Sequence, residues 1–465
     1  MSHKSLAALV AAVVVAACSP GPRAMVELSP LGVFEAAKPA VVIVETSNAV
    51  TWSVPQPVLT SQKTLQLRNT VVAMVRSGQV ANNETAIGQA SVKLLADNPG
   101  GWFTAGAQRH QQTDSVLALG SGFFVTEDGY LLTNNHVVQV SAGDVRQQLL
   151  DQLQHQGGDA RQMAAFRDEM SRGLGVPVND AQATKLFQWM LGVFKSDLRI
   201  ASITPSYRIG FGSMSAADVQ AQGLEVQLVA HGESTPGRDV AVLKAPGGRF
   251  VSLAAAPALP GPGATLAVIG YPCRCGGAAG FDPVQVLRPA LTQGTAREQV
   301  SMPGGWTALG TDAPIEHGNS GGPVLDDAGR VVGLATFSEA AGSEAPRSFA
   351  VPMAVASPIV AQAHVRLEQG SLGQAYTQAV SEFQQEHFKS ALPLFQQVAA
   401  TSVHDMYARQ YVTRTQSAIA SGRDRTPALG GALPAIAVGA YVAASAVVVV
   451  VGVILYRRRR VVRGW

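Results

Sequence analysis

The feature that most constrains this chain is a set of three short segments that join a β-strand pattern to one chemically reactive residue. In residues 119–138, two strand-like runs are connected by a Glu-Asp-Gly turn and end at His136. Asp239 opens a short, apolar strand, and a glycine-rich turn within residues 311–324 carries Ser320. These segments predict a mainly β protein in which His136, Asp239 and Ser320 converge across one groove.

These three residue types suit nucleophilic acyl transfer. A serine hydroxyl is a poor nucleophile until a base removes its proton, and histidine titrates near neutral pH. A buried carboxylate fixes the tautomer of the histidine and stabilises the imidazolium that forms. Glycines around Ser320 let the backbone turn and approach a substrate without Cβ clashes.

The same segments resemble the HtrA/Deg proteases, which have the chymotrypsin-like fold. The similarity lies in Gly-Ser-Gly-Phe, Asp-Gly-Tyr-Leu-Leu-Thr-Asn-Asn-His-Val-Val, Asp-Val-Ala-Val-Leu-Lys and Gly-Asn-Ser-Gly-Gly-Pro, in that order. It implies a serine endopeptidase built from two six-stranded antiparallel β-barrels, acting on proteins or peptides without a cofactor. His136 is then the general base, Asp239 its orienter and Ser320 the nucleophile, and the backbone N–H groups of Gly318 and Ser320 form the oxyanion hole.

The resemblance also indicates where a substrate binds. Pro314, six residues before the serine, corresponds to the floor of the specificity pocket. No carboxylate stands there to bind Lys or Arg, so we expect a preference for small or medium apolar side chains. Thr336 and Phe337 are expected where the substrate backbone pairs as an added strand.

The sequence has two other interpretations. The turn at Ser320 also fits the lipase pattern Gly-x-Ser-x-Gly, but that pattern needs a helix after the serine and the acid and histidine downstream. Here a β-hairpin follows and both partners lie upstream, so this interpretation fails. The second interpretation is an inactive, protease-like scaffold that binds partners. The absence of a triad residue would favour it, but His136, Asp239 and Ser320 are all present.

The protease domain is expected to span residues 31–365, with helical insertions at about 60–100 and 144–195. The insertions have apolar residues at helical spacing, and they either gate the cleft or are inert additions. Residues 370–422 resemble a tetratricopeptide (TPR) hairpin that binds a partner or a second copy. The alternative is a plain helical hairpin packed on the protease or near the membrane. A linker is expected at 423–433.

Both ends of the chain indicate a membrane. Residues 1–18 have the pattern of a lipoprotein signal peptide ending at Cys18, and the alternative is ordinary cleavage without lipidation. Residues 434–456 form an uncharged apolar stretch long enough for one transmembrane helix. The basic tail 457–465 follows at once, which predicts a cytoplasmic C-terminus and a periplasmic protease domain at the inner membrane.

Charge and cysteine content narrow the remaining functions. The formal net charge is +3, and five arginines fall in the last nine residues, so the rest is slightly acidic and offers no basic field to nucleic acid. No Cys/His spacing resembles a zinc site, and no metal is expected. Cys273 and Cys275 either form a tight disulfide or remain two free thiols.

Overall fold

The computed structural model describes residues 28–273, 282–339 and 347–427, and its central feature is a pair of closed six-stranded barrels. In the first barrel the strands follow the order β1, β2, β3, β7, β6, β4. In the second the order is β10, β11, β14, β13, β12, β8. This confirms the predicted pair of barrels.

The strands of the first barrel are β1 (Val41–Val58), β2 (Thr104–Phe124), β3 (Tyr130–Thr133), β4 (Arg199–Gly210), β6 (Leu224–His231) and β7 (Ala241–Lys244). Those of the second are β8 (Thr265–Gly270), β10 (Ala290–Met302), β11 (Trp306–Thr311), β12 (Pro323–Leu325), β13 (Val331–Glu339) and β14 (Arg347–Pro352). A separate two-stranded sheet pairs β5 (Met214–Ser215) with β9 (Val286–Leu287).

The alternation of side chains along each strand divides the core into separate apolar clusters. Val42 and Val44 of β1 pack with Phe124 inside the first barrel, whereas Ile43, between them, belongs to a larger cluster. Successive residues of a strand point to opposite faces, so one strand contributes to both clusters. The larger cluster also takes residues such as Tyr271 from the second barrel, and it therefore joins the two barrels.

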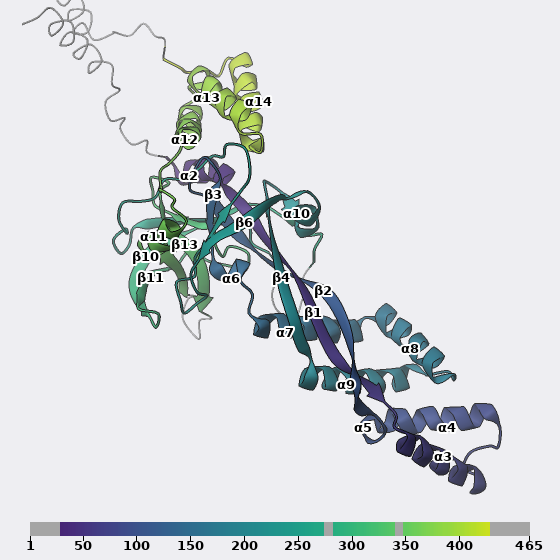
Figure 1. Cartoon of the computed structure of the whole chain (residues 1–465). Helices are drawn as coiled ribbons and strands as arrows, with labels where there is room; N and C mark the ends of the chain where they lie inside the picture. Colours follow the sequence, from purple (N-terminus) through teal and green to yellow (C-terminus); the bar gives the residue numbers. More distant parts are fainter. Residues whose placement is uncertain (1–27, 274–281, 340–346, 428–465) are drawn as a thin grey trace, which may run out of the picture.

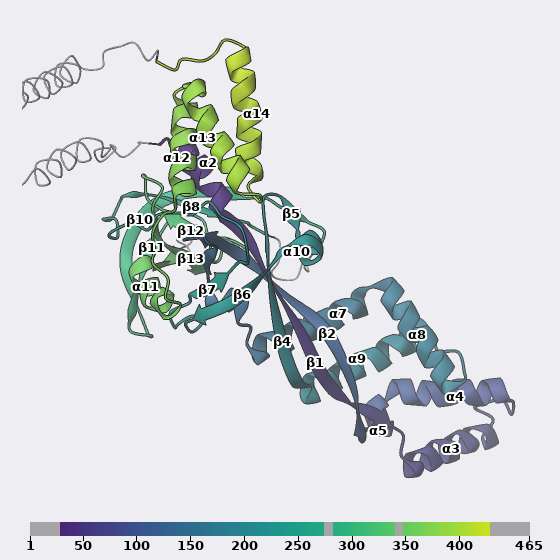
Figure 2. The ribbon, with the colours of Figure 1, turned by 45° about the horizontal axis from the view of Figure 1, so that its top comes forward.

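Strands β1, β2 and β4 continue beyond the first barrel as a three-stranded arm (Figures 1 and 2). The arm carries both insertions. The helices of the first insertion lie at its far end, away from the barrels (Figure 1). In the second insertion, the first and last helices pack along the arm, and the middle helix packs against those two. The helices are α3 (Ser61–Arg76), α4 (Glu84–Asp97) and α5 (Pro99–Trp102) in the first, and α7 (Ala142–Gly158), α8 (Ala160–Leu174) and α9 (Asp180–Asp197) in the second.

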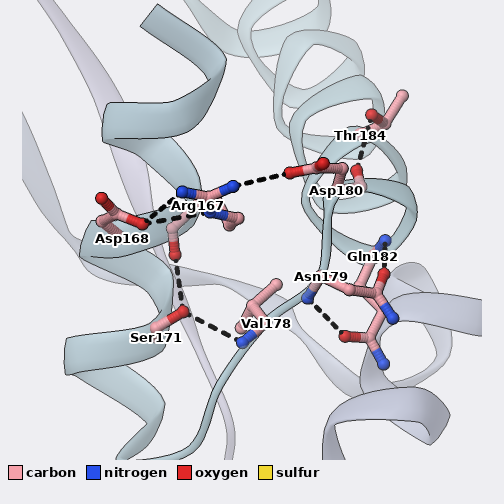
Figure 3. A network of polar contacts seen from close by, with 8 residues as sticks. All are labelled: Arg167, Asp168, Ser171, Val178, Asn179, Asp180, Gln182 and Thr184. Atoms are coloured by element: carbon pink, nitrogen blue, oxygen red, sulfur yellow. Dashed lines mark hydrogen bonds and ion pairs between the residues drawn. The ribbon is translucent and has the colours of Figure 1, made fainter. Parts of the chain in front are cut away.

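A local polar network fixes the turn between α8 and α9 (Figure 3). Arg167 forms ion pairs with its neighbour Asp168 and with Asp180 at the start of α9, both at 2.9 Å. Asn179 and Gln182 form a capping box that satisfies two backbone N–H groups at the first turn of α9. The second insertion is thus a helical unit whose turn is specified by its own sequence.

The C-terminal segment forms three helices that pack on the protease domain: α12 (Ser371–Gln384), α13 (Phe388–Thr401) and α14 (Met406–Ala420). They contact α2 (Pro30–Ala37), where Tyr411 donates a hydrogen bond to Glu35 at 2.8 Å. Glu127, in the turn before β3, accepts a hydrogen bond from the Leu372 N–H at the start of α12. The remaining helices are the 3₁₀ helix η1 (Lys38–Ala40), α6 (Asn135–Val138), α10 (Ala216–Gln222) and α11 (Met353–Gln362).

Several sequence expectations lie outside the described residues: the signal peptide 1–18 with Cys18, the transmembrane helix 434–456 and the basic tail 457–465. Within the part of the chain that the structure describes, none of the helices combines the length and hydropathy needed to span a membrane.

One carboxylic acid side chain is buried on β1, a strand that extends into the arm. Glu45 on β1 is 1% exposed, and among the described residues neither of its carboxylate oxygens has a hydrogen-bond partner. Burial raises the pKa of this carboxyl to about 7, although the charge of Arg208 acts in the opposite direction. The folded state therefore favours the protonated, neutral form.

This burial predicts a pH-dependent loss of stability. Because the folded-state pKa lies above the unfolded value of 4.5, the contribution of neutral Glu45 is complete below pH 4.5 and is lost as pH rises through about 7. Relative to its value at pH 4, the stability of the wild type at pH 8 should fall by roughly 3 kcal/mol more than that of Glu45→Gln. Urea unfolding from pH 4 to 8 measures this, and parallel pH profiles would contradict it.

Candidate active site

His136 and Asp239 are brought together by two neighbouring strands of the first barrel. His136 lies in α6, directly after β3, and Asp239 lies just before β7, which pairs with β3. The His136 backbone N–H donates to Asp239 Oδ1 at 2.9 Å, and Nδ1 of its ring lies 2.6 Å from Oδ2. The Asn134 side-chain amide donates to the Asp239 carbonyl at 2.7 Å. The backbone and side chain of Asp239 are therefore both fixed.

The environment of Asp239 keeps it ionised. Its side chain is fully buried, and burial alone would raise the pKa of the carboxyl. Hydrogen bonds from His136 and from the Thr336 hydroxyl, which donates to Oδ2 at 2.7 Å, outweigh burial and lower this pKa. A charged carboxylate is thus held against a histidine whose side chain is 40% exposed and so within reach of a ligand.

Ser320 lies in the turn between β11 and β12 of the second barrel, and this turn is bonded to both barrels. The Ser320 carbonyl accepts from the Ser121 N–H, at the end of β2, at 2.8 Å. The Gly321 N–H donates to the Ala335 carbonyl of β13 at 2.8 Å. The Ser320 hydroxyl donates to the Thr336 carbonyl at 3.0 Å. Thr336 therefore contacts Asp239 through its side chain and Ser320 through its backbone.

The backbone of this turn leaves two amides available. Gly318 has φ +91°, a conformation that side chains other than hydrogen rarely allow. Asn319 N–H donates to the Glu316 carbonyl at 3.0 Å, but within the described residues neither Gly318 N–H nor Ser320 N–H has an acceptor. Two unpaired donors beside a serine hydroxyl can stabilise an oxyanion that forms on the atom it attacks.

Comparison with known proteins relates this part of the chain to a family of peptidases. Residues 120–334 match the family model of the trypsin-like peptidase domain. The chain carries a trypsin-like peptidase domain. It is similar to two probable periplasmic serine endoproteases described as DegP-like. The one from Ectopseudomonas mendocina strain ymp is 33% identical over 110 residues, which are 23% of this chain and 21% of the relative. The one from Pseudomonas putida strain GB-1 is 36% identical over 90 residues, which are 18% of this chain and 19% of the relative. These relatives show that the peptidase domain is HtrA/Deg-like.

The matched region is short, so this chain spans about a fifth of the length of these curated relatives. Among solved structures, the serine endoprotease from Yersinia pestis aligns with a TM-score of 0.34 and 17% identity, over 72% of this chain and 66% of that one.

Pro314 and Phe337, the other residues expected to bind substrate, have different surroundings. Pro314 is exposed, and its carbonyl accepts from the Thr292 hydroxyl at 2.8 Å. Phe337 follows Thr336 on β13 and stacks on Phe349, with ring centroids 4.9 Å apart. The expected place of Pro314 at the floor of the specificity pocket stays a prediction.

The contacts of Ser121 and Tyr271 with the turn of Ser320 were not predicted from the sequence. The buried Ser121 hydroxyl donates to the Gly318 carbonyl at 2.6 Å and accepts from the Tyr271 N–H at 2.9 Å. The Gly-Ser-Gly-Phe motif contained Ser121, but only the folded barrels bring it to Gly318. Cys273 is disulfide-bonded, so it is not the free thiol of the second alternative; Cys275 lies outside the described residues.

The contact between Thr336 and Asp239 predicts a stability effect that is independent of catalysis. Thr336→Val keeps the shape of the side chain but leaves a buried carboxylate without one of its donors. We expect the free energy of unfolding at pH 7 to fall by about 2 kcal/mol, whereas Thr336→Ser, which keeps the hydroxyl, loses less than half of that. Urea denaturation measures both variants. A loss in Thr336→Val no larger than the loss in Thr336→Ser would contradict a contribution from the hydroxyl bond.

Proposed function

We propose that this chain is a serine endopeptidase that hydrolyses peptide bonds through an acyl-enzyme. His136 acts as general base, Asp239 orients it and Ser320 is the nucleophile. The observation that carries this proposal is the bond between His136 Nδ1 and Asp239 Oδ2, together with a serine turn bonded to the same barrel. With Nδ1 occupied by the carboxylate, Nε2 is the nitrogen left to accept the proton of the serine.

Attack requires the Ser320 hydroxyl to turn from the Thr336 carbonyl toward His136. A substrate backbone N–H that pairs with the Thr336 carbonyl takes the place of the serine hydroxyl there. The freed hydroxyl then transfers its proton to His136, and the oxygen attacks the substrate carbonyl. The N–H groups of Gly318 and Ser320 bind the resulting oxyanion.

Three serine-centred contacts support a small side chain at the position before the cleaved bond. The Ser338 hydroxyl donates to the Ile315 carbonyl at 2.8 Å and lies 3.2 Å from the Ser348 hydroxyl. The Ile315 N–H donates to Ser348 Oγ at 3.3 Å. These bonds join β13, β14 and the segment before Ser320, and we infer that they restrict the depth available there to a small or medium side chain.

The location and substrates of the enzyme are part of the proposal. The relatives' names describe periplasmic proteases, and the leader-like residues 1–18 indicate export. We place the domain in the periplasm, bound to the inner membrane through residues 434–456 and a lipid on Cys18. Its substrates are then envelope proteins, in quality control or regulated proteolysis. The helices of 370–422 provide a surface for a protein partner or a second copy.

Loss of the nucleophile tests the reaction. Ser320→Ala should abolish labelling by a fluorophosphonate probe and lower kcat for casein or a fluorogenic peptide by ~10⁴-fold or more. Ser301→Ala, which changes an exposed serine of the same barrel, serves as the matched control. Folded wild type that neither hydrolyses the substrate nor takes the label would contradict the proposal and favour the scaffold hypothesis.

Removal of the Ser338 and Ser348 side chains tests the proposed preference for the residue before the cleaved bond. The double variant Ser338→Gly and Ser348→Gly should raise kcat/KM for a peptide with Phe before the cleaved bond, relative to the same peptide with Ala, by about 10-fold or more. Ser301→Gly should leave this ratio unchanged. A double variant that stays folded, retains Ala cleavage and shows no shift in the ratio would place the specificity pocket elsewhere.

A further inference from the structure

The end of strand β8 lies directly against the turn that carries the two candidate oxyanion donors. The Cys273 N–H donates to the His317 carbonyl at 2.9 Å. A Cβ atom added to Gly318 would lie 2.9 Å from Cys273 Sγ and 2.2 Å from the Tyr271 carbonyl oxygen. The sulfur and backbone of this segment therefore fill the space beside Gly318, with no room for another side chain.

The bond to the His317 carbonyl sets the direction of the Gly318 N–H. A trans peptide unit is planar, so the carbonyl of His317 and the N–H of Gly318 point in opposite directions. As long as Cys273 holds the carbonyl on its own side, the N–H must point away from Cys273. Rotation of this peptide unit would replace a donor by a carbonyl oxygen, which repels an oxyanion.

A second contact restrains the other side of Gly318. The Ser121 hydroxyl donates to the Gly318 carbonyl at 2.6 Å and accepts from the Tyr271 N–H at 2.9 Å. Two carbonyls flank the Gly318 N–H, and both are held by this segment. Cys273 N–H binds the His317 carbonyl directly, and Tyr271 N–H holds the Ser121 hydroxyl that binds the Gly318 carbonyl. The orientation of that N–H depends on the position of residues 271–273.

Cys273 is also disulfide-bonded, and the other two cysteines lie outside the described residues. A disulfide restrains the backbone at the cysteines it joins. We propose that Cys273 is a positioning residue for the oxyanion hole, and that its disulfide makes the hydrolytic rate depend on redox state. This inference rests on the proposed peptidase function.

The chemical step is thiol–disulfide exchange with a dithiol. A thiolate of the dithiol attacks one sulfur of the bridge, and its second thiol completes the exchange. The dithiol is oxidised to a disulfide by loss of two electrons and two protons. Cys273 and the cysteine bridged to it are reduced and take up those electrons and protons as thiols. The freed segment then no longer holds the His317 carbonyl in one orientation.

The experiment compares the full chain before and after treatment with dithiothreitol, followed by its removal under anaerobic conditions. Reduction should lower kcat for a fluorogenic peptide by about 10- to 100-fold, with KM changing less than twofold, because the hole binds the transition state rather than the substrate. Cys273→Ser, which keeps the backbone N–H but cannot form the bridge, should have the low kcat of the reduced protein and no response to dithiothreitol. Cys18→Ser and Cys275→Ser identify the bridged cysteine: the variant that removes it should behave like Cys273→Ser, and the other, as the control, should respond like the wild type.

A second measurement isolates the oxyanion hole. A peptide aldehyde forms a tetrahedral adduct with the nucleophile, whereas the corresponding peptide amide only occupies the cleft. Reduction should weaken aldehyde binding by about 10-fold or more and leave amide binding unchanged. Equal kcat in both redox states, a loss confined to KM, equal weakening of both ligands, or cooperative unfolding of the reduced protein at the assay temperature would each overturn the positioning role. Oxidised protein without hydrolysis or labelling would instead refute the peptidase function itself.

Discussion

The hydrogen bonds that attach the turn of Ser320 to both barrels are the interaction on which the rest of the site depends. Ser121 N–H, from the first barrel, holds the Ser320 carbonyl, and the Ala335 carbonyl, from the second, holds the next N–H of the turn. Each barrel closes on its own, so neither fixes the position of the other. Since His136 and Asp239 come from the first barrel, these bonds and the shared apolar cluster set their distance from Ser320.

The C-terminal helices belong to the same structural unit as the site. Glu127 accepts hydrogen bonds from the Leu372 N–H and the Ser371 hydroxyl at the start of α12, and it lies in the turn between β2 and β3, which leads directly to His136. On the other side, the Tyr411 hydroxyl reaches Glu35 of α2, just before β1. A carboxylate at a helix N-terminus satisfies backbone donors and interacts favourably with the helix dipole. These contacts therefore connect the C-terminal helices to elements that adjoin the strands of His136 and Asp239.

Short-range patterns in the sequence were sufficient to predict the strands around His136, Asp239 and Ser320, because alternation and turn residues are local signals. They did not predict that β1 and β2 run on for 18 and 21 residues as an arm, since polar, exposed strand residues carry little periodic signal. The resemblance predicted Thr336 beside the substrate, and this stays a prediction. Its hydroxyl bond to Asp239 was not predicted, because it joins residues 97 positions apart in the sequence.

Thr336 links the acid, the nucleophile and the substrate under the proposed mechanism. Its hydroxyl helps to keep Asp239 ionised, and its carbonyl holds the Ser320 hydroxyl when no substrate strand is paired. A hydroxyl bonded to a neutral carbonyl gains little net free energy in water, about 1 kcal/mol, so a substrate N–H can displace it at low cost. Under this mechanism the Ser320 hydroxyl turns toward His136 only when a substrate backbone pairs with β13. Activation of the nucleophile is then coupled to the binding of an extended peptide.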